Sequence, residues 1–214
     1  MKPIQKSKEP ASLLAHRKQI HSNYDNYPNK DELRDYLLAE QGYICCYCMQ
    51  RIKKETMKIE HWQPQSKYQE KQLDYQNLLA ACQGNAGKPK QLQHGDTHKG
   101  EQEITINPIN NLLEPIKYRK DGRIYSDDHN INQDLNNVLN LNTQTLVNNR
   151  AEIIDEVIQD LTKIKGKQAA WSVNDVKREL QKYEAKNAAG EYEPYCQAVI
   201  YFLNKRFAKQ LSSG

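Results

Sequence analysis

Four short blocks between residues 45 and 100 hold most of the side chains in this sequence that could bind a metal ion or move a proton. In chain order they are Cys45-Cys46-Tyr47-Cys48, Glu60-His61, Asn77 to Cys82, and His94-Gly95-Asp96-Thr97-His98-Lys99. Thiolates and imidazoles are the usual ligands of zinc, whereas carboxylates bind hard cations such as Mg²⁺. The sequence therefore indicates metal chemistry concentrated in one stretch of the chain.

The cysteines have the spacing of a zinc site. Two residues separate Cys45 from Cys48, which lets both thiolates reach one zinc ion from a tight turn, and Cys82 and His94 could complete a tetrahedron. Cys46 points away from its neighbours in such a turn and is left out. In a reducing compartment this pattern indicates zinc or a redox pair; a disulfide set would require export. The simpler alternative is a protein that merely has several thiols, but four candidate ligands so close together favour zinc.

Glu60 and His61 form a second candidate site. Residues 57–62 alternate with a period of two, which predicts a strand, and Pro64 ends it. Neighbouring strand residues face opposite ways, so these two can act together only where the strand ends and bends. A cation-binding carboxylate beside an imidazole that accepts a proton from water is the pair needed for metal-assisted phosphodiester hydrolysis. A histidine next to a glutamate is more often an ordinary surface or core residue, but the nearby ligands favour catalysis.

The segments before and between these blocks must position them. Residues 1–28 are polar, with one helix expected at 11–20, and we expect this arm to lie across the rest of the protein or against a partner. A helix capped by Asn29 or Asp31 and closed by Gly42 should lead directly to Cys45. The apolar run 77–82 predicts a buried strand beside 57–62, followed by irregular chain as far as His94.

The second half of the chain is predicted to be mainly helical. Residues 103–108 predict a strand, and 116–125 predict a hairpin that turns at Asp121-Gly122. Helical spacing of apolar residues begins near Ile131, and amphipathic helices are expected at about 173–186 and 192–210. These elements would support the metal sites from one side.

Composition and charge limit the class of protein. The chain has 214 residues, 37% of them hydrophobic, and a mean hydropathy of -0.95, so much of its surface is polar or meets a partner. Residues 1–100 carry 16 Lys and Arg against 11 Asp and Glu, an excess of +5, whereas residues 101–214 carry 15 against 16. A polyanionic substrate fits this excess, as does an ordinary solvated surface. No apolar run approaches the roughly 20 residues of a membrane span, so we expect a cytoplasmic protein without membrane contact.

The four blocks together carry a family resemblance. Cys-x-Tyr-Cys, Ile-Glu-His-Trp-x-Pro-x-Ser, Asn-Leu-Leu-Ala-x-Cys and His-x-Asp-x-x-Lys-Gly resemble the ββα-metal motif of the HNH endonucleases, in the PtuB-type variant of Septu and retron-associated antiphage systems. The resemblance covers about a quarter of the chain. It implies an α+β fold made of an N-terminal arm and helix (1–42), an HNH core with a zinc-binding knuckle (43–110), and a small hairpin with a mainly helical support or docking region (111–214).

The resemblance also implies roles for individual residues. His61 matches the general base that activates water, and Asn77 matches the central asparagine that holds the loop and orients the histidine. Glu60 stands where these enzymes generally have an aspartate ligand, and Asp96 stands where a second histidine is common. The hydrolytic cation, Mg²⁺ or Mn²⁺, would then lie between Glu60 and Asp96.

The last block departs from the family pattern. Gly95 stands where a zinc-binding cysteine is more usual, and His94 is the obvious substitute as fourth ligand. His98 competes with Asp96 for the hydrolytic cation, but on a helix the two are about 200° apart and cannot bind the same ion. We prefer Asp96, with Lys99 available to face the phosphate.

Partners and rival functions follow from the same resemblance. It implies DNA as the substrate, an ABC-type ATPase (PtuA) as partner, and in retron systems a reverse transcriptase with its ncRNA or msDNA. Basic residues near the motif would hold phosphates without reading bases; they are Arg51, Lys53, Lys54, Lys58 and Lys67. Two alternatives stay open, an RNase that cleaves tRNA and a non-catalytic zinc module that binds nucleic acid.

Overall fold

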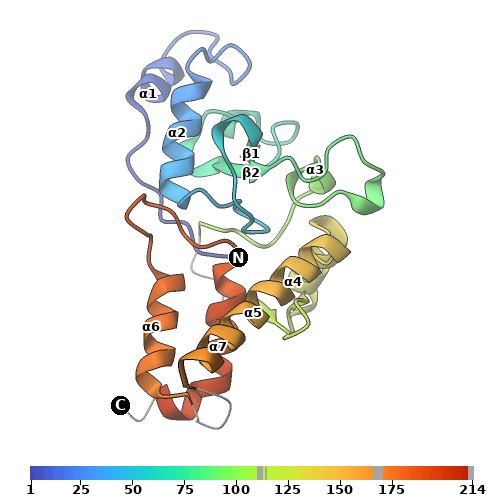
Figure 1. Cartoon of the computed structure of the whole chain (residues 1–214). Helices are drawn as coiled ribbons and strands as arrows, with labels where there is room; N and C mark the ends of the chain where they lie inside the picture. The colour runs from blue at the N-terminus through green and yellow to red at the C-terminus, as the bar shows by residue number, and fades with distance from the viewer. Residues whose placement is uncertain (110–112, 114, 166–170, 212–214) are drawn as a thin grey trace.

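The chain folds into a small α+β part that carries the metal-binding blocks and a helical part beside it (Figure 1). The computed structural model describes residues 1–109, 113, 115–165 and 171–211. In the first part, α1 (Ala11–Arg17) and α2 (Lys30–Gln41) lie next to the strands β1 (Met57–His61) and β2 (Leu78–Cys82), and the short α3 (Asp96–Lys99) follows. The expected α+β class is confirmed.

The two strands form an antiparallel pair whose register joins Met57 to Cys82 and His61 to Leu78. All five residues of β2 are buried, and the strand packs against α2. The side chain of Gln41 fastens α2 to this strand, since its amide donates to the carbonyl of Ala80 and accepts from the Ala80 N–H. Both strands were predicted from the sequence, β1 from its alternation and β2 from its apolar run.

Helix α2 ends where predicted. Gly42 has φ +60°, a left-handed conformation, and its N–H bonds back to the carbonyl of Ala39. A Cβ at this position would lie 2.4 Å from a ring carbon of Tyr192. Glycine is thus required here both by the turn and by the close approach of a distant loop.

The N-terminal arm lies across the rest of the protein, as expected. Ile4 is buried and its N–H donates to the carbonyl of Pro108. Lys6 forms a buried ion pair with Glu40 of α2 at 2.7 Å and also donates to the carbonyl of Leu78 in β2. Helix α1 stops at Arg17, earlier than predicted, and leaves Ile20 86% exposed.

One predicted strand is wrong. Residues 103–108 have no strand partner within the part of the chain that the structure describes, and their backbone groups bond to side chains instead. The carboxylate of Asp134 accepts the N–H groups of Thr105 and Ile106, and the Trp62 indole donates to the Ile106 carbonyl. These side-chain bonds satisfy the backbone where a neighbouring strand would otherwise do so.

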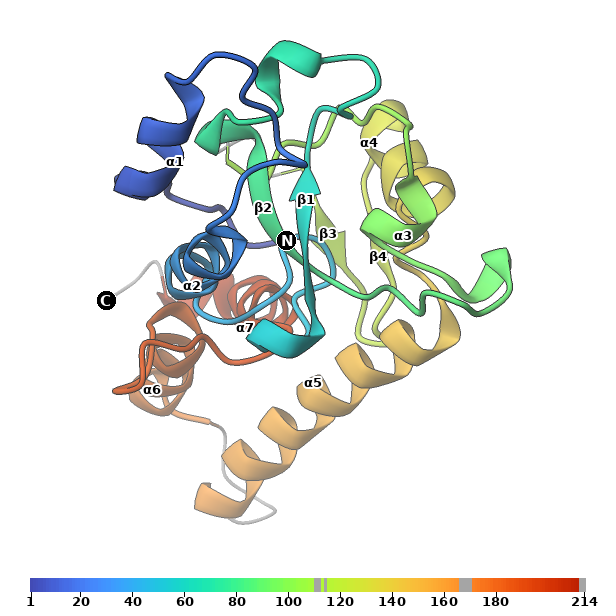
Figure 2. The same ribbon diagram turned by 90° about the horizontal axis from the view of Figure 1, so that it is seen from above.

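The second half is mainly helical, in agreement with the sequence. The predicted hairpin is present as β3 (Lys117–Tyr118) and β4 (Ile124–Tyr125), with Gly122 at φ +86° in its turn. The helices that follow are α4 (His129–Gln133), a π-helical turn (Asp134–Val138), α5 (Gln144–Lys165), α6 (Val173–Glu184) and α7 (Cys196–Leu211). Figure 2 shows the long α5 extending away from the strands β1 and β2. Within the described residues, no helix is both long and apolar enough to span a membrane.

Candidate active site

Three thiols meet where the turn before β1 touches the end of β2. Cys45, Cys48 and Cys82 are all buried, and their sulfur atoms lie within 4.8 Å of one another. Cys48 Sγ and Cys82 Sγ are 3.7 Å apart. Zn–S bonds of about 2.3 Å at tetrahedral angles put two sulfurs about 3.8 Å apart, so the donor set fits a structural zinc ion. Cys46 lies outside this group, as predicted.

His94 lies beside the three thiols. Its Nε2 is 3.5 Å from Cys82 Sγ, close to the roughly 3.6 Å expected between a sulfur and an imidazole nitrogen on one zinc ion. Its Nδ1 is buried and has no hydrogen-bond partner among the described residues. Burial lowers the pKa of His94, which keeps the ring neutral as a zinc ligand must be. Among the described residues of this cluster, the group whose ligand atoms all lie within 4.8 Å of one another consists of the three cysteines and does not include His94. The assignment of His94 as fourth zinc ligand therefore stays a prediction.

One of the three thiols, Cys45, already favours the charged form that zinc needs. Burial raises the pKa of Cys45, but hydrogen bonds from Cys46, Cys48 and Cys82 outweigh it and bring that pKa well below its usual value. Burial raises the pKa of Cys48 well above its usual value. The cluster thus concentrates negative charge on one sulfur that its neighbours stabilise.

The backbone at Gly95 favours glycine. Gly95 has φ +61° and ψ -141°, a conformation that side chains rarely adopt, and its N–H donates to the Leu139 carbonyl at 2.7 Å. His98, three residues on, turns toward the second half of the chain, where its Nδ1 donates to the Val138 carbonyl at 2.8 Å. His98 is therefore engaged away from Glu60.

Glu60 and Asp96, far apart in sequence, meet at the end of β1. Each carboxyl group shifts the pKa of the other, and each also contacts a lysine. Lys99 Nζ lies 2.9 Å from Glu60 Oε1, and Lys58 Nζ lies 2.5 Å from Asp96 Oδ2. Two carboxylates facing each other are the donor set that a hard divalent cation binds, so the residues fit the expected Mg²⁺ or Mn²⁺.

Burial and mutual contact split the pKa values of the two carboxyl groups. Burial and the adjacent Asp96 raise the pKa of Glu60 well above its usual value. Burial also raises that of Asp96, but hydrogen bonds from Glu60 and Lys58 lower it by more. Like-charge repulsion at such a short distance disfavours two free carboxylates, and a shared proton or a cation relieves it.

His61 is oriented for proton transfer. Its Nε2 lies 2.9 Å from the carbonyl of Gln72, which can only accept, so Nε2 carries the proton and Nδ1 holds the free lone pair. The edge of the Tyr24 ring packs against the imidazole at 4.6 Å between centroids. Burial lowers the pKa of His61, which keeps the ring neutral near pH 7.

Asn77 ties together the two segments that hold His61. Its Nδ2 donates to the carbonyls of Gln63 and Lys71, and its Oδ1 accepts the Gln63 N–H at 2.7 Å. Lys71 precedes Gln72, whose carbonyl orients the imidazole. These bonds connect the segments around Gln63 and Lys71, and the positioning role that the resemblance implies for Asn77 stays a prediction.

These groups line one cavity of about 300 Å³, which contains Lys58, Glu60, His61, Asp96 and Lys99. The structure thus brings together the residues proposed for hydrolysis from β1 and α3. Glu60 and His61 are neighbours in sequence, and both can line the cavity because β1 ends at His61.

Sequence reasoning missed several contacts of this site. The hydroxyl of Tyr47 donates to Glu60 Oε1 at 2.7 Å, a contact that the sequence did not predict. Lys99 is 2% exposed and faces Glu60, where the sequence suggested a phosphate. Arg51 donates to the backbone carbonyls of Gly42 and Tyr192, so its guanidinium is engaged in structure. The local sequence around Tyr47 contains no signal for its role, because the contact joins separate segments.

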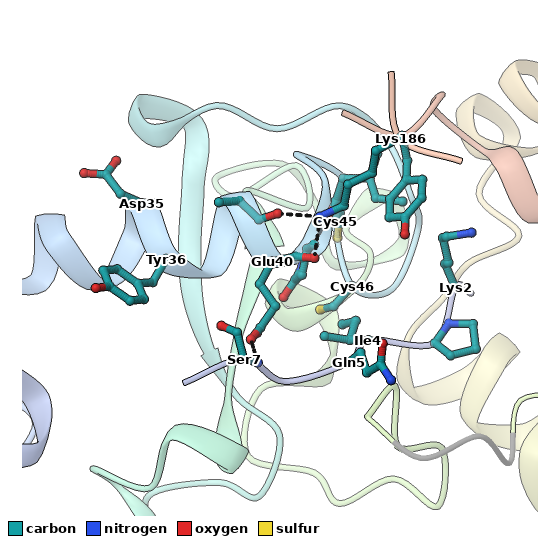
Figure 3. Close-up of a pocket in the computed structure, with 15 residues that line it drawn as sticks. Lys2, Ile4, Gln5, Ser7, Asp35, Tyr36, Glu40, Cys45, Cys46 and Lys186 are labelled. Atoms are coloured by element: carbon teal, nitrogen blue, oxygen red, sulfur yellow. Dashed lines mark hydrogen bonds between the residues drawn. The ribbon is translucent and has the colours of Figure 1, made fainter. Parts of the chain in front are cut away.

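A larger cavity, of about 700 Å³, lies between the N-terminal arm, α2 and the loop before α7 (Figure 3). Its polar groups are engaged within the protein: Lys186 donates to the carbonyls of Ala39 and Glu40, and the Glu40 carboxylate accepts the Ser7 N–H. We place the active site in the smaller cavity, because that one contains the carboxylates and the imidazole.

Comparison with known families supports this choice. Residues 45–84 match the family model described as HNH endonuclease, a family of phosphodiester hydrolases. The match includes the thiol cluster, both strands, Glu60, His61 and Asn77, and it ends before Asp96. No curated protein matches the chain. The match implies nuclease activity on nucleic acid for this segment.

Proposed function

We propose that this chain, an enzyme with an HNH endonuclease domain at residues 45–84, hydrolyses phosphodiester bonds of DNA with Mg²⁺ or Mn²⁺ held by Glu60 and Asp96. The observation that carries the proposal is the meeting of the two carboxyl groups beside His61 in one solvent-accessible cavity. A bound cation would polarise the phosphate and stabilise the leaving oxygen.

His61 acts as general base in this proposal. Its Nδ1 accepts the proton of the attacking water, while the Nε2–H stays bonded to the Gln72 carbonyl. That bond fixes the tautomer and the ring plane, and it stabilises the imidazolium as it forms. Asn77 keeps the Gln72 carbonyl in place through its bonds to Gln63 and Lys71, so we assign it a positioning role.

The thiol cluster has a structural role in this proposal. A zinc ion bound by Cys45, Cys48, Cys82 and His94 would hold the turn before β1, the end of β2 and the segment leading into α3 together. Because Glu60 is on β1 and Asp96 begins α3, such a link would fix the distance between the two carboxylates.

We further propose that the nuclease is the effector of an antiphage defence system and works with an ABC-type ATPase. The support is the resemblance of its four sequence blocks to the PtuB-type nucleases. Residues 111–214 would provide the docking region, and a retron reverse transcriptase with its ncRNA or msDNA would be a further partner.

Cleavage assays separate these functions. Purified protein, alone and with the ATPase, is incubated with plasmid DNA and with total tRNA in Mg²⁺ or Mn²⁺. We expect cut plasmid from the wild type, none from His61→Ala, and wild-type cleavage from His129→Ala, a control at an exposed histidine outside the cavity. Cleavage of tRNA alone would establish the RNase alternative. Zinc and nucleic-acid binding without any cleavage dependent on His61 would establish a non-catalytic module.

A further inference from the structure

Lys58 is the lysine of the active-site cavity that has room to move. Its ammonium group contacts Asp96 Oδ2 at 2.5 Å and Thr97 Oγ1 at 3.2 Å, and its side chain is 37% exposed. Lys99, the other lysine of the cavity, is fully enclosed: its side chain is 1% exposed and bonds both to Glu60 and to the His61 carbonyl. Lys99 therefore remains a fixed counter-ion, whereas Lys58 can leave its partner at little cost.

Lys58 holds the same carboxylate that the cation is proposed to bind. When Glu60 and Asp96 are both ionised, as cation binding requires, their charges and those of Lys58 and Lys99 sum to zero. A divalent cation between the carboxylates brings this group to +2, which weakens the hold of Asp96 on Lys58 and attracts a phosphate carrying one negative charge.

We propose that the Lys58 ammonium competes with the divalent cation for Asp96 and, when the cation binds, moves onto a non-bridging oxygen of the substrate phosphate. The inference rests on the proposed function. Lys58 suits both positions because it lies on β1 two residues before Glu60 and lines the same cavity as His61. Among the basic residues that the sequence suggested for phosphate contact, Lys54 pairs with Asp35, Lys67 pairs with Glu103, and neither lines this cavity.

The first test measures cation binding without nucleic acid. Mn²⁺ is titrated into zinc-loaded protein, and free Mn²⁺ is followed by its electron paramagnetic resonance signal. Lys58→Gln removes the competitor and should bind Mn²⁺ about threefold more tightly, as expected for the loss of a partly exposed ion pair. Lys117→Gln is the matched control: Lys117 also pairs with an aspartate, Asp127, its side chain is 33% exposed, and it is outside the cavity.

The second test measures binding of a short DNA duplex with Mn²⁺ present, in a His61→Ala background that does not cut. Lys58→Gln should weaken binding severalfold and reduce the slope of log affinity against log salt by about 0.9, the loss of one phosphate contact. Lys117→Gln should leave both quantities unchanged.

The outcomes are distinct. If wild-type protein binds Mn²⁺ and cuts DNA, but Lys58→Gln binds Mn²⁺ equally or more weakly, the inference on Lys58 is wrong and the proposed function stands. An unchanged salt slope overturns the phosphate contact in the same way. If the wild type itself neither binds Mn²⁺ nor cleaves, the proposed function fails and this inference fails with it.

Discussion

Replacing His94 by alanine tests whether the thiol cluster has a fourth ligand. His94 is 4% exposed, its Nε2 lies 3.5 Å from Cys82 Sγ, and its Nδ1 has no hydrogen-bond partner in the described part of the chain. Structural zinc sites contribute about 10–16 kcal/mol at pH 7, so an equal share for one of four ligands is about 3 kcal/mol. We therefore expect His94→Ala to weaken zinc binding by about two orders of magnitude.

His98→Ala is the matched control, because it removes an imidazole from the same short segment. The ring of His98 donates a hydrogen bond to the Val138 carbonyl, so its loss should cost about 1 kcal/mol of unfolding free energy and leave zinc affinity unchanged. The assay is competition for zinc with a chromogenic chelator, together with zinc content by mass spectrometry and unfolding in urea.

We expect the two variants to differ in how readily they release zinc. Zinc should leave His94→Ala at chelator concentrations that the wild type and His98→Ala resist. If His94→Ala holds zinc as tightly as the wild type, the site is completed by another group and the assignment of His94 is refuted. If only His98→Ala releases zinc, the roles of the two histidines are reversed.

Three further predictions concern the rest of the site. Asn77→Ala removes three hydrogen bonds and should lower the unfolding free energy by about 3 kcal/mol in urea, whereas exposed Gln76→Ala should change it by less than about 0.5 kcal/mol. Tyr47→Phe keeps the packing but removes the hydrogen bond to Glu60. We expect the unfolding free energy in urea to fall by about 1–3 kcal/mol, and an unchanged value would argue against that contact. Burial lowers the pKa of His61, so the base stays neutral down to below about pH 6.5, and the acid limb of kcat/KM against pH should have its midpoint under that value. A midpoint above it would contradict the buried, uncharged ring.

Local sequence determined the elements and the donor types. The alternation of residues 57–62 and the apolar run 77–82 are enough to form β1 and β2, because each strand buries a face that its own sequence defines. Gly42 and Gly122 form turns that the sequence predicts, because glycine has no Cβ and therefore tolerates a positive φ. The two-residue spacing between Cys45 and Cys48 likewise specifies a two-thiol turn, because the reach of so short a segment is set by its own backbone.

Long-range packing decided the pairing of charges and the fate of the segments between elements. Residues 103–108 look like a strand, yet Asp134, nearly 30 positions on, supplies the bonds that a neighbouring strand would have made. The same holds at the active site. The sequence identifies Lys58 and Lys99 as basic residues but does not show which carboxylate each one contacts. Such contacts depend on how β1 and α3 approach each other in space, and a one-dimensional pattern contains no information on that distance.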